Sequence, residues 1–306
     1  MPPSGSGDPP ISYGGQAVIE GVMIRSPRAM AVAARRPDGG IAVQARPVGG
    51  LLRGPLRRVP LLRGVLALWS MIALGIRALS WSSAIADGRR EEEGDLGRIG
   101  ARAWASALAS ILGATAIIFL LPVAMTAWLA TRLPAPWLAV AAEGLLRVGI
   151  VVGYVWALGR AAEVRRLFEY HAAEHMAIAT LERGHALTVP AIRREPREHP
   201  RCGTAFLLTV AVVAGVVFLP LGAPPLPWWL ASRVALVPLV AAGANAAIRF
   251  AGEHRQAPLA RWAFWGNLAL QRLTTREPDD EQIQVAVAAL ERARAEEGRA
   301  QDPARP

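Results

Sequence analysis

The sequence predicts an α-helical integral membrane protein with about four spans, a small β-rich cytoplasmic N-terminal region and a cytoplasmic helical insert that carries a metal site. Three observations predict this class. Of the 306 residues, 53% are hydrophobic, and many of them form long runs without charge. The 34 basic residues, all of them Arg, gather between those runs. Four of the five histidines lie within 29 residues, beside a single cysteine that rules out an internal disulfide.

Two stretches predict a first transmembrane hairpin. No charge interrupts the chain between Arg102 and Arg132, and about 20 apolar residues are enough to cross a bilayer. The stretch from Trp137 to Gly159 is also long enough, although it contains Glu143 and Arg147. These two residues are four apart, so on a helix they share one face and neutralise each other.

A second hairpin is predicted from two shorter runs. Ala205 to Leu221 is apolar over about 17 residues and leads into a proline-rich turn with two tryptophans, which is typical of a membrane interface. Val234 to Ile248 is charge-free but only about 22 Å long as a helix, so it requires tilt or partial burial. Arg63 and Arg77 interrupt the stretch 61–86, which favours an interfacial or core helix over a fifth span.

The arginines predict the orientation. With four spans, every Arg-rich segment lies on one side, and the positive-inside rule makes that side cytoplasmic. We therefore expect a multi-pass protein of the bacterial cytoplasmic (inner) membrane with both termini in the cytoplasm, in contact with the lipid bilayer and its anionic headgroups. Nucleic-acid binding is not expected, because the arginines flank membrane segments without interleaved aromatic residues.

The two ends of the chain predict soluble structure. Met30–Arg36 and Ile41–Arg46 alternate like strands around a Pro-Asp-Gly-Gly turn, and Gln16–Met23 supplies a further strand. Acidic residues at Pro278–Glu281 open an amphipathic helix, followed by a disordered tail from about Glu296. The predicted organisation is an N-terminal β-rich region at 1–60, an interfacial helix and charged linker at 61–100, hairpins at 101–159 and 205–250, an insert at 160–204, and a C-terminal helix and tail at 251–306.

The insert contains the pattern that indicates chemistry. His171 and His175 are one turn apart in a helical run from Arg160 to Arg183, so both reach one ion, and Glu174 lies beside them. This H-x-x-E-H order is the inverted zincin motif, in which two imidazoles hold zinc and the glutamate is the general base. The alternative is a solvated polar face of the helix.

A zinc site needs at least one more protein ligand. His199 and Cys202 are the first candidates, because their spacing on a tight turn brings both to one ion, and Glu182 is another. Three ligands leave a position open for catalysis, whereas the set His171, His175, His199 and Cys202 closes the site and makes it structural. Glu20, alone between apolar residues, is interpreted as a strand-end residue, with a ligand role as the alternative.

Four blocks of sequence occur in a recognisable order, namely Tyr13–Met23, Glu169–His175, His199–Thr204 and Leu270–Asp280. Together they resemble the DUF1385 (YqhQ-like) family of bacterial membrane proteins. The resemblance implies a predicted metal-dependent enzyme with its metal at the histidine block. One departure is visible, since the family tends to carry a basic residue after the second histidine and this chain has Met176.

Two functions from different classes follow. The first is a membrane-embedded zinc-dependent hydrolase, with Glu174 activating water against an amide or ester, and proteolysis ranks first. Its substrate would be a membrane-protein segment or a lipid. The second is a non-catalytic scaffold in which a structural zinc stabilises the loop and the protein binds a membrane partner such as the export or insertion machinery. Transport is a third alternative, because Glu143 and Arg147 are charged residues inside a predicted span. It ranks below both functions because no inverted repeat is visible.

Overall fold

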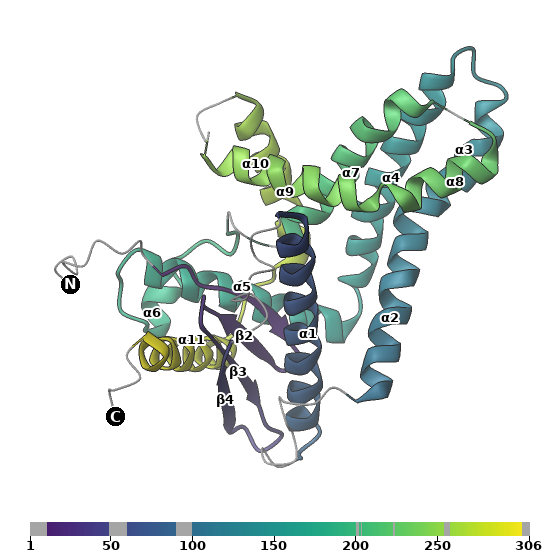
Figure 1. Ribbon diagram of the computed structural model, residues 1–306. Helices are drawn as coiled ribbons and strands as arrows, with labels where there is room; N and C mark the ends of the chain where they lie inside the picture. The colour runs from purple at the N-terminus through teal and green to yellow at the C-terminus, as the bar shows by residue number, and fades with distance from the viewer. Residues whose placement is uncertain are drawn as a thin grey trace. The chain divides into compact units, whose positions relative to one another are not determined.

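The computed structural model describes residues 11–48, 60–89, 100–199, 202, 204–222, 224–253 and 258–301 (Figure 1). The chain divides into two compact units. The first, called the sheet unit, comprises Met1–Ala105, Ala162–His199 and Thr275–Pro306. The second, called the helical unit, comprises Ser106–Ala161 and Pro200–Thr274. Segments far apart in sequence therefore come together in each unit.

The sheet unit is built on a four-stranded antiparallel meander with the strand order β1-β2-β3-β4. Its strands are β1 (Gly14–Val18), β2 (Gly21–Arg25), β3 (Ala29–Arg35) and β4 (Ile41–Pro47). The predicted hairpin of β3 and β4 is confirmed, and Ala31 pairs with Ala45 in its register. Alternate residues face opposite sides, so Val22 packs in one hydrophobic cluster and Met23 in the other.

The single strand predicted at Gln16–Met23 is wrong, because the chain reverses within it and forms β1 and β2. Glu20 has a φ of 52° at this reversal, a left-handed conformation that is uncommon for residues other than glycine and is typical of a turn. Gly21 follows, and a Cβ there would lie 2.1 Å from the carbonyl oxygen of Ala33. The turn thus depends on a glycine whose role the alternating pattern conceals.

Helices cover both faces of the sheet. One face packs against α5 (Ala162–Glu182) and α11 (Asp280–Gln301), with the short α6 (Val189–Ile192) alongside. The other face packs against α1 (Pro60–Ala86) (Figure 1). The stripe that α1 buries recurs with helical spacing and consists of Leu74, Ala78, Trp81 and Ile85. This packing is what the core-helix alternative for 61–86 requires.

Helix α11 starts as the sequence predicts and ends later. Asp279 and Gln282 form a reciprocal cap, in which the Gln282 amide donates to Asp279 Oδ1 at 2.7 Å and the Asp279 amide donates to Gln282 Oε1 at 2.9 Å. The disordered tail predicted from Glu296 is wrong, because the helix continues to Gln301. Glu297 is buried there and accepts hydrogen bonds from Ser26 Oγ at 2.7 Å and from a backbone amide at 2.9 Å.

The helical unit consists of apolar helices. They are α2 (Ala101–Thr115), the π-helical η3 (Ala116–Leu120), α3 (Leu121–Ala130), α4 (Pro136–Leu158), α7 (Thr204–Phe218), the 3-10 turn η4 (Leu219–Leu221), α8 (Leu226–Ala235), α9 (Val237–Glu253) and α10 (Pro258–Thr274). Two helical stretches among the described residues are long and apolar enough to cross a membrane, Trp104–Ala130 and Trp137–Leu158. They coincide with the first predicted hairpin.

The second predicted hairpin has a different form. Its first half is a shorter apolar helix, Leu208–Leu221, within the described residues. Its second half, Leu226–Ala235 followed by Val237–Ile248, is bent by 48° and amounts to one further span if the bent pair crosses as a unit. Two to three apolar helices are therefore able to span a membrane. The count of four spans stays a prediction.

A proline explains the π-helical turn in the first span. Pro122 has no amide hydrogen, so the carbonyl of Ile118 four residues before it lacks the usual helical partner. The guanidinium of Arg147 replaces that partner, because its Nε donates to the Ile118 carbonyl at 3.0 Å. The charge on α4 thus satisfies a backbone group on the neighbouring helix.

Glu143 is the centre of a buried ionic network in the helical unit. It pairs with Arg147 four residues later, as the spacing predicts. Arg233 on α8 also donates to it, with 2.5 Å between Nη2 and Oε2, and Trp229 Nε1 donates at 3.0 Å. All three charged side chains are essentially fully buried. Two guanidiniums therefore share one carboxylate and leave a net positive charge.

Candidate metal centre

Helix α5 places the predicted metal-binding residues in its most buried part. It packs against β1 and β2, and every residue from Tyr170 to Thr180 is buried. His171, Glu174 and His175 lie in this stretch, with 9%, 4% and 2% of their surface exposed. The alternative of a solvated polar face is therefore wrong. Polar side chains are costly to bury without partners, so their presence here indicates interactions beyond packing.

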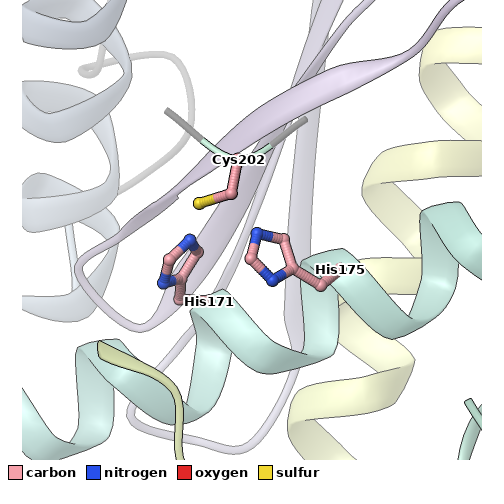
Figure 2. Close-up of side chains that lie close together, drawn as sticks. All are labelled: His171, His175 and Cys202. Carbon is pink, nitrogen blue, oxygen red and sulfur yellow. The ribbon is translucent and has the colours of Figure 1, made fainter. Parts of the chain in front are cut away.

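Three of the four predicted ligands come together. His171, His175 and Cys202 each offer one ligand atom, and these atoms all lie within 4.8 Å of one another. The two imidazole centroids are 4.3 Å apart. Figure 2 shows the Cys202 thiol directed toward the two rings from the side opposite α5. Ligand atoms around a tetrahedral zinc are roughly 3.5 Å apart, so the donors fit this ion with small side-chain movements.

The protonation state of His175 suits a metal ligand. Its Nδ1 lies 2.7 Å from the carbonyl oxygen of Arg197, and a carbonyl only accepts, so Nδ1 carries the proton and Nε2 presents its lone pair. Burial, with a smaller contribution from His171, lowers the pKa of His175 to about 3. The imidazole is therefore neutral at physiological pH, as metal binding requires.

His199 lies next to this group without belonging to it. Its ring centroid is 5.7 Å from that of His175, and its Nε2 is 3.4 Å from Glu182 Oε2. Burial lowers the pKa of His199 as well. Glu182, the alternative ligand in the sequence, is thus the partner of His199. The four-ligand set is not assembled in this arrangement, although His199 is near enough to interact with a bound ligand.

Strand β1 approaches the catalytic candidate closely. A Cβ on Gly15 would lie 3.1 Å from Glu174 Oε1 and 2.3 Å from the carbonyl oxygen of Met23. The backbone oxygen of Met23 leaves no room for a side chain at Gly15, and the carboxylate of Glu174 would also have to shift slightly. Sequence reasoning missed Gly15, although a Gly-Gly pair inside a strand is a signal of close approach by another group. The Arg197 carbonyl was also missed, since a backbone group has no residue signature.

Glu20 has a structural role. It lies in the turn between β1 and β2, and the guanidinium of Arg166 donates to both of its oxygens, one of them at 2.6 Å. The hydroxyl of Tyr170 donates to it at 3.2 Å. This hydrogen bonding raises the pKa of Arg166, and burial raises the pKa of Tyr170. The interpretation as a strand-end residue agrees with these contacts, which attach the sheet to α5.

Comparisons with known proteins support the family resemblance. A family profile described as "Protein of unknown function (DUF1385)" matches residues 59–296. The chain is also similar to the uncharacterized protein YqhQ of Bacillus subtilis (strain 168), with 30% identity over 293 residues that cover 91% of each chain. No solved structure matches it significantly.

Proposed function

We propose that this chain, which belongs to the DUF1385 family, is a membrane-embedded zinc-dependent hydrolase with a site that faces the cytoplasm. One observation carries the proposal, namely the convergence of His171, His175 and Cys202 within 4.8 Å. Glu174 lies between the two histidines in sequence and is buried on the same helix. Three protein ligands leave the fourth position of a tetrahedral ion for water or substrate, as catalytic zinc sites do.

The residues present fit hydrolytic chemistry. A zinc ion held there would act as a Lewis acid and lower the pKa of water. Glu174 would accept the proton of the water that attacks an amide or ester carbonyl. His175 would be fixed in its ligating tautomer by the Arg197 carbonyl, which is 2.7 Å away. Proteolysis ranks first among the reactions, because it is the commonest use of two helical histidines with a glutamate.

We also propose the membrane topology, with four spans, both termini in the bacterial cytoplasm and anionic lipid headgroups around the basic segments. Support comes from the span ends, where exposed tryptophans meet arginines. The Arg132 guanidinium lies 3.7 Å from the ring centroid of Trp128, and that of Arg160 lies 3.6 Å from Trp156. Aromatic and basic side chains gather in this way at membrane interfaces.

One observation favours a second candidate, the non-catalytic scaffold with a structural zinc. The third donor beside the histidine pair is the thiol of Cys202, and thiolates are the typical ligands of closed structural sites. A movement of His199 away from Glu182 would complete a four-ligand set. The protein would then bind a membrane partner such as the export or insertion machinery.

Elemental analysis of the detergent-purified full chain tests both. We expect about one zinc per chain in the wild type and in Glu174→Gln, and none in His171→Ala. His185→Ala is the matched control, because the His185 side chain is 58% exposed and outside the cluster. Retention of zinc in His199→Ala supports the open site of His171, His175 and Cys202, and its loss favours the closed one, in which His199 is the fourth ligand. A wild type that binds no zinc under non-stripping conditions refutes both candidates.

A further inference from the structure

The outer edge of β1 carries backbone groups that no described strand pairs with. β1 is the first strand of the sheet, and no other strand among the described residues pairs with its far side. Glu20, just before β2, accepts a hydrogen bond from the amide of Arg35 on β3 at 2.8 Å. Backbone groups alternate in direction along an antiparallel strand, so the even-numbered residues of β2 bond to β3. Its odd-numbered residues therefore bond to β1, at Gln16 and its alternate neighbours. The N–H and C=O groups of Gly15 and Ala17 consequently point outward.

This open edge is next to the candidate catalytic residues. Helix α5 packs against β1, and the Cβ position of Gly15 is 3.1 Å from Glu174 Oε1. Gly14 and Gly15 are exposed and have no side chains to shield the edge. Glycine weakens a strand, so two consecutive glycines here lower the stability of β1. The two glycines do, however, allow another backbone to approach this edge closely.

We propose that the substrate is an extended polypeptide that adds to the edge of β1 as a further strand. The proposal rests on the hydrolase function above and names its substrate class. An added strand lies about 4.8 Å from its neighbour, and alternate residues of a peptide pair with the outward groups of Gly15 and Ala17. A peptide bond is thereby presented beside Glu174 and the histidine pair. Lipids lack the repeated N–H and C=O groups that match this edge, and folded proteins present them only on their own edge strands.

The reaction on such a strand balances with water alone. Water forms the new carbon–oxygen bond, the carbon–nitrogen bond of the peptide breaks, and Glu174 transfers the proton that it accepts from water to the leaving amine. The strand geometry keeps the peptide bond in place during these steps, and this positioning is a large part of catalysis in general.

The test removes one hydrogen-bond donor from the edge. Ala17→Pro deletes the outward N–H and leaves the ladder to β2 intact, since proline is tolerated on edge strands. Ala17→Ser is the matched control, because it keeps the N–H. The probes are a mixed-sequence pool of quenched-fluorescence decapeptides and 4-nitrophenyl acetate, which has no peptide unit to pair with the edge. Both are assayed with zinc-loaded full-length protein in detergent.

We expect Ala17→Pro to cleave the decapeptide pool at least tenfold more slowly than wild type and Ala17→Ser. Its zinc content and ester hydrolysis should stay within twofold of wild type. Equal cleavage of the pool by Ala17→Pro, or ester hydrolysis by a wild type that leaves the pool intact, overturns the strand proposal and retains the hydrolase. Hydrolysis that persists in Glu174→Gln, or a chain without zinc, overturns the hydrolase and with it the strand proposal.

Residue-resolved amide hydrogen exchange tests whether a peptide adds to the edge of β1, without any need for catalysis. In zinc-loaded Glu174→Gln, the decapeptide pool should slow the exchange of the Gly15 and Ala17 amides. The Gln16 amide, which already bonds to β2, should not change. No protection overturns the proposal. Protection that appears without peptide and grows with protein concentration assigns the edge to a second copy of this chain, and also overturns it.

Discussion

Glu143→Leu should destabilise the helical unit more than any other single substitution in its buried network. The carboxylate accepts four hydrogen bonds, from Arg147 Nη2, from Arg233 Nε and Nη2, and from Trp229 Nε1. Leucine leaves both buried guanidiniums without their counter-ion. Removal of one partner from a buried ion pair costs about 3–5 kcal/mol, which corresponds to a fall in melting temperature on the order of 10 °C for a chain of this size. Thermal unfolding in detergent, followed by circular dichroism, measures the change.

Two comparisons distinguish this explanation from a general sensitivity of α4. Leu145→Ala alters a side chain that is 76% exposed on the same helix, and it should change the stability by less than about 0.5 kcal/mol. Replacement of the whole network by Glu143→Leu, Arg147→Met and Arg233→Met should restore most of the lost stability, because apolar residues of similar volume often equal a buried ion network. A loss below about 1 kcal/mol in Glu143→Leu would refute the reasoning.

Three further predictions concern the sheet unit. Gly15→Ala should lower the free energy of unfolding by about 1–3 kcal/mol, because the new Cβ would lie 2.3 Å from a backbone oxygen. Gly14→Ala is the control, since its Cβ meets nothing within 4 Å. Urea unfolding measures the free energy of unfolding of both variants. Glu297→Ala should cost about 1.5–3 kcal/mol, because it removes the charged acceptor of the Ser26 hydroxyl and of the Arg28 amide, and a melting temperature equal to wild type contradicts this. Because the pKa of His175 is lowered from 6.5 to about 3, the metal-free fold should lose stability as pH falls below 6.5. The loss should reach at most about 1.4 kcal/mol per pH unit, and His175→Leu should show a shallower pH dependence in the same titration.

Local patterns in the sequence predict what local physics determines. A charge-free run locates the first candidate span, and a long apolar stretch with one pair of opposite charges four residues apart locates the second. The hairpin of β3 and β4 follows from alternation and a turn of special residues. The helical histidine pair follows from the spacing of one turn, and His171 and His175 do face one another. Each of these features depends on residues a few positions apart.

Features that join distant segments escaped the same reasoning. Arg233 is 90 residues from Glu143, and no periodicity connects them. The reversal at Glu20 was missed because the residues on both sides alternate as a single strand would. The helical end of α11 was missed because Glu297 is a polar residue in a polar tail, and its burial depends on Ser26 at the other end of the chain. In each case a carboxylate binds a partner from a distant segment that the local sequence does not reveal.

The buried polar stretch of α5 depends both on local spacing in the sequence and on contacts with distant segments. Apolar side chains at His171, Glu174 and His175 would pack against the sheet at no desolvation cost, yet three polar groups occupy the positions. The Arg197 carbonyl is a hydrogen-bond partner of His175, and the Cys202 thiol lies close to both imidazoles. Under the proposed hydrolase, these positions lose packing stability in exchange for chemistry, which is the usual character of a functional site. The glycines at the edge of β1 also lower the stability of the fold at the same location. Under the proposals above, these two losses of stability together favour a site that acts on an extended chain over one that only stabilises the fold.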